Sequence, residues 1–195
     1  MERIIDAYYA NDYHAISVPN IVGHVTPLQN GVVSKVGFQG QGDYSQPLQF
    51  SGLTAPAGTN MQYNVFQYRG YLIPSMAGTY TVRFDWVDDM ALVFVGDAAV
   101  TGFDVNQALL GASLFGPPAD AKLATINIAA ADVGKALPFR IYWANDGGPA
   151  GFLASIVDPS GAVVLGLDSV KNQQIVSSCD AGSLAPVWPA WEAEQ

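Results

Sequence analysis

Cysteine and histidine are scarce in this chain of 195 residues, and each scarcity excludes a kind of site. The single cysteine, Cys179, can form no disulfide within the sequence, so it is either half of a bridge to a cysteine elsewhere or a buried thiol. It has no basic cluster beside it, which favours a structural role over a reactive one. The two histidines, His14 and His24, have no second histidine or cysteine at metal-site spacing, which argues against zinc.

Positive charge is also scarce. Eight lysines and arginines stand against seventeen aspartates and glutamates, which gives a formal net charge of -9. Such a chain repels a phosphate backbone, so nucleic acid is not an expected partner. Carboxylates are, by contrast, the usual ligands of calcium, and an acidic chain therefore suits a hard cation.

Long apolar runs and catalytic signatures are missing as well. No run of about 20 apolar residues could span a bilayer, and residues 1–10 lack the apolar core of a signal peptide. We therefore expect a soluble chain that does not insert into membranes. The sequence has neither a Gly-x-Ser-x-Gly elbow nor a phosphate loop ending in Gly-Lys-Ser or Gly-Lys-Thr. These absences favour a protein that is not an enzyme.

The residues that are present favour β-structure. Half of them are hydrophobic and only 13% are charged, which is enough for a sizeable core. Short runs of β-forming residues alternate with Gly, Pro, Asn and Asp, and segments of helical period are rare. This pattern predicts an all-β, antiparallel β-sandwich with long loops and few short helices. The clearest predicted strands are 63–68, 78–87, 91–95, 124–128, 139–143, 152–157 and 163–165, and the only predicted helices are short ones at 104–112 and 129–134.

The length of the chain suits a single domain. We expect one sandwich over residues 1–182, whose first forty residues supply edge strands and loops. Residues 183–195, which contain Trp188, Trp191 and two prolines, are predicted to form a C-terminal strap or a linker stub. Residues 158–161 predict a proline-containing turn that joins the last two strands.

Two blocks of sequence carry a family resemblance. The segment from Tyr68 to Val82, followed by the segment from Trp86 to Gly96, resembles the central motif of the GLEYA adhesin domain. That family is a fungal branch of the protective-antigen-type β-sandwiches. The segment from Leu137 to Phe152 resembles the family's next strand and its calcium-binding loop. Both blocks occur in the family's order and together cover roughly residues 63–158.

The resemblance implies a calcium site. In the related flocculins and epithelial adhesins, two adjacent aspartates joined by a cis peptide hold a calcium ion that also binds sugar hydroxyls. An asparagine and backbone carbonyls of a later loop complete the calcium shell. The metal ligands that this implies are Asp88, Asp89, Asn145, Gly147 and Pro149, the last two through their carbonyl groups. The carbohydrate contacts that it implies are Asp88, Asp89, Asn145, Asp146 and Gly148.

Coordination chemistry agrees with such a site. Calcium takes six to eight oxygen ligands at about 2.3–2.6 Å and tolerates irregular geometry. Neighbouring side chains on a trans strand point to opposite faces, whereas a cis peptide between Asp88 and Asp89 turns both carboxylates toward one ion. The glycines at 147 and 148 allow the backbone to approach the ion closely. Vicinal hydroxyls of a terminal sugar would then take the open positions of the ion.

Sugar sites also use aromatic platforms and amide side chains. Trp143 is a candidate platform, with a place in the core as the alternative, and Gln39, Gln41 and Gln46 are candidate hydrogen-bonding residues. The adhesin relatives often carry a bulky side chain in the calcium loop, whereas residues 147–149 are small here. The chain also lacks the disulfides of some relatives, because it has one cysteine.

These observations predict a calcium-dependent lectin that acts in adhesion. We expect it at the cell surface or cell wall, as a monomeric domain whose partner is a glycan or terminal sugar. Two alternatives remain open. One is a structural or protein-binding sandwich that has lost sugar binding. The other is a glycoside hydrolase or a non-catalytic module of a glycan-active enzyme, although adjacent carboxylates control the gap between acid and base poorly.

Overall fold

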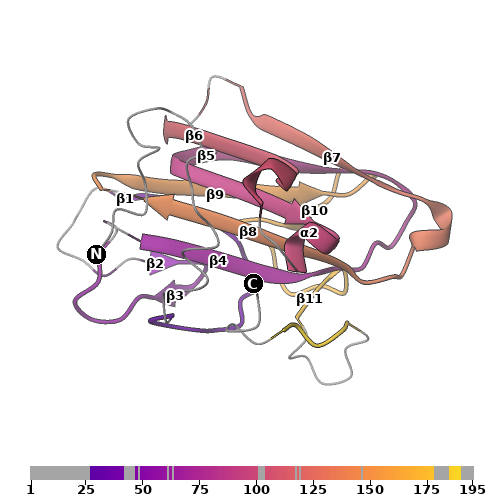
Figure 1. The fold of residues 1–195 in the computed structure, drawn as a ribbon, viewed down its shortest axis with the longest axis horizontal. Helices are drawn as coiled ribbons and strands as arrows, with labels where there is room; N and C mark the ends of the chain where they lie inside the picture. The colour runs from indigo at the N-terminus through magenta and orange to yellow at the C-terminus, as the bar shows by residue number, and fades with distance from the viewer. Residues whose placement is uncertain are drawn as a thin grey trace.

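The computed structural model describes residues 27–41, 47, 49–60, 62, 64–100, 104–116, 118, 120–145, 147–177 and 185–189, and strands are their main regular structure (Figure 1). The strands are β1 (Phe38–Gln41), β2 (Gln49–Phe50), β3 (Leu53–Thr54), β4 (Asn64–Leu72), β5 (Gly78–Val95), β6 (Leu110–Gly116), β7 (Lys122–Ile128), β8 (Leu137–Asn145), β9 (Ala150–Val157), β10 (Val163–Leu165) and β11 (Ile175–Val176). Three short helical segments accompany them, namely α2 (Asp97–Val100), η3 (Val105–Gln107) and η4 (Ala130–Asp132). The all-β prediction is confirmed.

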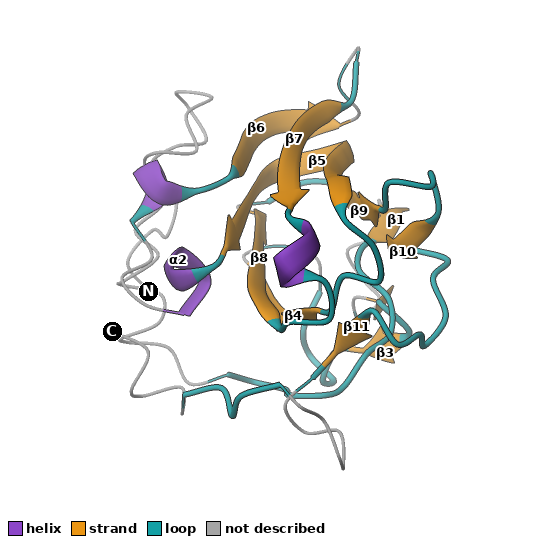
Figure 2. Ribbon diagram, turned by 90° about the vertical axis from the view of Figure 1, so that its right-hand side faces the viewer, coloured by secondary structure: helices purple, strands orange, loops and turns teal. Residues whose placement is uncertain are grey.

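Strand β5, with 18 residues, organises the sheet because it changes partners halfway along. Its first half pairs with β9 on one side, from Thr81 to Asp88, and with β7 on the other. Its second half pairs with β8, from Met90 to Val95, and with β6. The main order is β1-β9-β5-β8-β4-β11, and every pair of the sheet is antiparallel. In Figure 2 β9 with β1 and β8 with β4 diverge on either side of β5.

The main core lies between these two halves of the sheet. Alternate residues of β9 and β8 point into it, among them Phe152 and Ile156 from one half and Ile141 and Trp143 from the other. A second apolar cluster covers the opposite face of β8 and β5, where Tyr142, Ala144 and Leu92 pack with α2 and the C-terminal segment. The second half of β5 is therefore buried on both faces, which explains its continuous apolar run.

The C-terminal segment 185–189 lies against β4 and β8. The ring of Trp188 is 6% exposed and packs edge-on against Tyr71 at a centroid distance of 5.2 Å. The guanidinium carbons of Arg69 and Arg140 lie 5.7 and 5.2 Å from the centroid of the same ring. These contacts anchor the described part of the strap to the sheet by cation–π and apolar packing.

Two expectations about local structure were wrong and two were confirmed. Residues 104–112 form no such helix, because only η3 is helical and Leu110 already begins β6. Pairing of β6 with Val87–Val93 of β5 overrides the helical preference of its Ala and Leu residues. The predicted strands 78–87 and 91–95 are one strand. The region around 129–134 contains η4, and the N-terminal part supplies β1 at the edge of β9, both as predicted.

The predicted turn at 158–161 joins β9 to β10. The Asp158 Oδ1 accepts hydrogen bonds from the backbone N–H groups of Ser160 at 2.9 Å and Ala162 at 3.0 Å. Gly161 closes the turn with a φ of +88°, a conformation that L side chains rarely adopt. No helix in the described part of the chain has the length and apolarity needed to cross a membrane.

Candidate metal site

The partner change of β5 places the two aspartates beside the loop between β8 and β9. Asp88 is the last residue paired with β9, opposite Gly151, and Met90 is the first paired with β8, opposite Ala144. Since β8 ends at Asn145 and β9 begins at Ala150, residues 146–149 connect these two partners of β5. The sheet register therefore brings Asp88 and Asp89 next to Asn145 and this loop.

The bond between Asp88 and Asp89 is a cis peptide, as the family resemblance implies. Asp89 is 2% exposed and Asp88 is half-buried. The indole Nε1 of Trp143 donates a hydrogen bond of 3.0 Å to the backbone carbonyl of Asp88. Trp143 itself is fully buried in the main core, so the core alternative is confirmed for this residue. Its indole instead fixes the backbone of Asp88 from the core side of the sheet.

The electrostatics of the pair disfavour two ionised carboxylates. Burial, a side-chain hydrogen bond with Asp89 and the negative charge of Asp89 together raise the pKa of Asp88 to about 7, and burial contributes most. All three contributions penalise the ionised form of Asp88. A cation between the two carboxylates would reverse this penalty, because it would neutralise both charges at once. The pair therefore has the charge and the oxygen donors that a hard divalent cation requires.

The rest of the predicted donor set lies on β8 and the following loop. Asn145 is 1% exposed and its backbone pairs with Asn64 of β4. Gly147 and Gly148 are half-buried and Pro149 is exposed, while Asp146 lies outside the described residues. Gly148 has a φ of +76°, so a glycine is favoured there by the backbone itself. This conformation explains why the loop is small.

The predicted donor set includes an asparagine and carbonyl groups, which are neither acidic side chains nor nitrogen or sulfur ligands. Within the described ranges, no three His, Cys, Asp or Glu side chains cluster as metal ligands would. Two carboxylates, one amide oxygen and main-chain carbonyls are nevertheless a donor set that fits calcium and not zinc.

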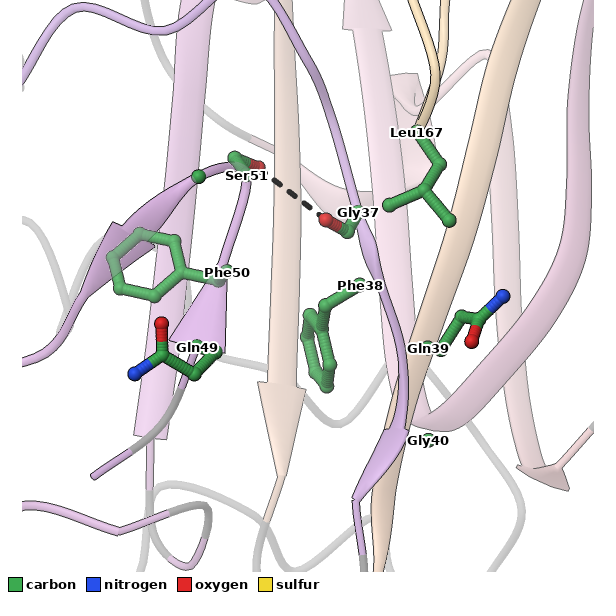
Figure 3. Close-up of a pocket in the computed structure, with 9 residues that line it drawn as sticks. Gly37, Phe38, Gln39, Gly40, Gln49, Phe50, Ser51 and Leu167 are labelled. Atoms are coloured by element: carbon green, nitrogen blue, oxygen red, sulfur yellow. Dashed lines mark hydrogen bonds between the residues drawn. The ribbon is translucent and has the colours of Figure 1, made fainter. Parts of the chain in front are cut away.

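Of the glutamines predicted as sugar contacts, Gln39 and Gln41 lie on β1. Gln39 lines a shallow depression between β1 and the β2–β3 hairpin, together with Phe50, Ser51 and Leu167 (Figure 3). Gln41 ends β1, where its backbone is registered with Ala150, and Gln46 lies outside the described residues. The depression does not include Asp88 or Asp89.

Sequence reasoning missed the residue that flanks the aspartates on the outer face of the sheet. Trp86 precedes Asp88 by two positions, and its ring lies over Gly151, the residue opposite Asp88. The signal that could have revealed it is the spacing, because residues two apart on a strand share a face.

An antiparallel sandwich whose long central strand changes partners at a cis-linked aspartate pair defines a domain of the protective-antigen type. The GLEYA domain family matches residues 64–158 of this chain. The match spans the segment from the start of β4 to the residue after β9, which includes both aspartates and the β8–β9 loop. The resemblance seen in the two sequence blocks is thereby confirmed.

A solved structure with a TM-score above 0.5 supports the fold. The epithelial adhesin 6 A domain from Candida glabrata, in complex with Galβ1-3GlcNAc, has 14% identity, with a TM-score of 0.53 over 91% of this chain and 84% of that chain. A subtype-switched epithelial adhesin 9 A domain of the same organism, in complex with β-lactose, has 13% identity, with a TM-score of 0.49 over 82% of this chain and 73% of that one. A PA14 sugar-binding domain from an RTX adhesin has 18% identity, with a TM-score of 0.41 and coverages of 65% and 61%. A comparison with curated protein sequences found no match.

Proposed function

We propose that this chain is a calcium-dependent carbohydrate-binding domain of an adhesin, acting at a cell surface or cell wall and without catalytic activity of its own. The observation that carries the proposal is the juxtaposition of Asp88 and Asp89 with Asn145 at the junction of the two sheet halves. Burial and the neighbouring Asp89 both oppose the ionisation of Asp88. A cation bound between the two carboxylates would stabilise their ionised forms.

Similar proteins support the sugar half of the proposal. Residues 64–158 match the GLEYA domain family, and the epithelial adhesin 6 A domain was solved with the disaccharide Galβ1-3GlcNAc. We extend this binding class to the present chain on the basis of the shared fold and of its own oxygen donors. A terminal sugar on a cell or wall surface is the partner that we propose.

We assign the residues of the site to two roles, metal ligands and sugar contacts. The carboxylates of Asp88 and Asp89, the amide oxygen of Asn145 and the carbonyls of Gly147 and Pro149 would hold the calcium ion. The bound ion would supply open coordination positions for two vicinal hydroxyls of a sugar. Asp146 and Gly148, on the same loop, are proposed as further contacts to the sugar.

Packing around the site would preorganise it for ligand binding. Asp89 and Asn145 are buried, so their side chains lose little further freedom when a ligand binds. The hydrogen bond from Trp143 fixes the backbone of Asp88 from the core side. The loop at Gly148 presents backbone to the ligand, since no atom lies within 4 Å of the position that a Cβ would take there.

One observation favours a second candidate, a sandwich that binds calcium and has lost sugar binding. The loop residues 147–149 are small, so the described part of the loop offers no large side chain to embrace a sugar. Titration calorimetry separates the two candidates. Calcium should bind the full chain, and a hexose or disaccharide should then bind in calcium and not in chelator. Heat from calcium with none from any sugar on a broad glycan array would favour the second candidate.

Two substitutions test the site directly. Asp88→Ala and Asn145→Ala should each abolish sugar binding while the protein keeps its far-ultraviolet circular dichroism. Asp168→Ala, which changes an exposed aspartate outside the site, should bind as the unaltered chain does. Sugar binding retained by either site variant would contradict the assignment. Reducing-sugar release from polysaccharides by the purified chain would contradict the absence of catalysis.

A further inference from the structure

Trp86 is placed beside the proposed metal site on the outer face of β5. Val87, between Trp86 and Asp88, is fully buried in the main core. Side chains alternate along a strand, so Trp86 and Asp88 both project from the opposite face. A bulge between Phe84 and Trp86 in the pairing with β9 allows Phe84 and Val87, three positions apart, to share the core.

The indole of Trp86 lies across two neighbouring strands. A Cβ added to Gly151 on β9 would stand 2.5 Å from its Nε1, and a Cβ added to Gly40 on β1 would stand 2.7 Å from its Cη2. Neither glycine has the positive φ that favours glycine, so the ring itself excludes a side chain at both positions. The two glycines form a flat floor on which this ring rests.

Packing alone does not explain a tryptophan in this place. The Nε1 of Trp86 is buried and has no hydrogen-bond partner among the residues that the structure describes. A buried donor left unsatisfied costs on the order of 1–3 kcal/mol, and a phenylalanine would cover the same glycines without it. The side chain is half-buried, so part of its large ring remains in contact with solvent. Such a ring suits a ligand that stacks.

We propose that Trp86 is the platform of a second sugar subsite, which takes the unit linked to the terminal sugar bound at the metal. The inference rests on the proposed function. Gly151 is directly opposite Asp88, and Gly40 is on the next strand, so the ring begins about 5 Å and ends about 10 Å from Asp88 at ordinary strand spacing. That interval matches the step from one sugar ring to the next.

The chemistry of the platform selects the occupant. The C–H face of a pyranose stacks on an indole, whereas its hydroxyls remain free to bond with amide groups at the rim. Gly40 also lines the depression that contains Gln39 and Gln49 (Figure 3). An oligosaccharide that extended from the metal across Trp86 would therefore reach the edge of this depression at Gly40. The ligand class is therefore an oligosaccharide of two or more units and not a single hexose.

The test compares monosaccharides with disaccharides on the full chain in saturating calcium. The probes are a panel of hexoses and of disaccharides that end in them, including galactose and Galβ1-3GlcNAc. We expect the preferred disaccharide to bind roughly ten-fold more tightly than its terminal hexose. Trp86→Ala should remove this advantage, with calcium affinity and hexose affinity unchanged. A disaccharide affinity that is unaltered in a calcium-binding Trp86→Ala protein would overturn the subsite.

A second variant displaces the ring without removing it. Gly40→Ala would push its Cβ against the Trp86 ring, so it should lower disaccharide affinity and leave hexose affinity as it was. Gly31→Ala is the matched control, because the Cβ there meets only the flexible side chain of Leu53. A merely structural Trp86 would lower the melting temperature in these variants with no change in the disaccharide-to-hexose ratio, and that result would also overturn the subsite.

Failure of the proposed function gives a different result. If the unaltered chain bound calcium and no sugar of any length, both proposals would fall together. If it bound a hexose and its disaccharide with equal affinity, only the second subsite would fall. Ligand-induced change of tryptophan fluorescence supplies an independent readout, since it should vanish in Trp86→Phe and persist in Trp188→Phe.

Discussion

Arg140 and the aspartate pair are ionisable groups of the same sheet, and the protein treats them in opposite ways. Arg140 is fully buried, yet its guanidinium donates to the carbonyl of Ala99 at 2.7 Å and to the Oε1 of Gln67 at 2.6 Å. Burial lowers the pKa of Arg140 to about 10, so it remains a cation at neutral pH. Asp88, by contrast, has a pKa raised to about 7 by burial and by Asp89.

The difference separates a structural charge from a functional one. The cation of Arg140 is served by groups of the protein itself, which include the hydroxyl of Tyr142 at 3.2 Å and the ring of Trp188. In the aspartate pair, by contrast, burial and the neighbouring Asp89 both disfavour the anion of Asp88. The contacts of Arg140 stabilise the folded protein, whereas the ionised aspartate pair destabilises it. Such destabilisation is common at sites where a ligand supplies the opposite charge.

The largest effect should come from removing the structural charge. Arg140→Ala leaves buried acceptors on Ala99 and Gln67 unsatisfied and opens a cavity, so we expect a loss of about 3–5 kcal/mol in the free energy of unfolding, measured in urea. Arg83→Ala, which breaks an exposed ion pair of 2.6 Å with Asp85, should cost about 0–1 kcal/mol. If Arg140→Ala and Arg83→Ala lost the same free energy of unfolding, Arg140 would have no special structural role.

Neutralising the functional charge should have the opposite effect on stability. Asp88→Asn should lower calcium affinity by at least about 100-fold, because an amide replaces an anionic ligand. At pH 8 without calcium, however, it should raise the free energy of unfolding by about 1 kcal/mol, a value reduced for the partial exposure of the group. Asp168→Asn is the control. Metal-free Asp88→Asn protein that is less stable than the unaltered chain would contradict the electrostatic interpretation.

The same pKa sets a pH dependence. Because the folded pKa of Asp88 lies above its ordinary value of 3.8, its contribution to stability is complete below about pH 4 and is lost as the pH rises through 7. The difference in stability between Asp88→Asn and the unaltered metal-free chain should therefore grow over this range. Calcium must displace the proton, so its affinity should fall about ten-fold per pH unit below 7. Calorimetry between pH 5 and 8 measures both, and a flat calcium affinity would refute the assignment.

The smallest effect concerns the loop. Gly148→Ala forces a side chain into a positive φ in open space, so it should cost about 1 kcal/mol and weaken calcium binding by roughly five-fold. Gly134→Ala is a matched control, since Gly134 has a φ of +79° and equally open surroundings beside η4. It should lose similar stability and bind calcium normally. If both variants bound calcium equally well, the loop would have no part in the site.

The sequence predicted the position of the candidate site better than its surroundings. Asp88, Asp89 and Asn145 could be paired because a family motif records which distant residues meet. The strand β6 was missed because its pairing with β5, and not its own composition, decides its conformation. No local pattern distinguishes the buried Arg140 from an exposed arginine, since its partners come from positions 67 and 99.

The two tryptophans beside Asp88 show the same limit. Trp143 was a candidate platform and is a core residue, whereas Trp86 received no role and lies on the outer face. Which face a residue occupies depends here on a bulge at the β5–β9 pairing and on glycines contributed by two other strands. Such features arise from contacts between distant segments, and single-chain periodicity does not contain them.

The hydrogen bond beneath Asp88 has a mechanical consequence. Trp143 stacks on Phe66 at 5.0 Å between ring centroids, and Phe66 stacks on Phe50 at 4.1 Å, which links the aspartates to the β2–β3 hairpin by three rings in series. Close-packed rings transmit displacement with little slack. The aromatic core therefore makes the backbone at Asp88 rigid. A displacement of the β2–β3 hairpin would reach Asp88 through these rings and not through a loop.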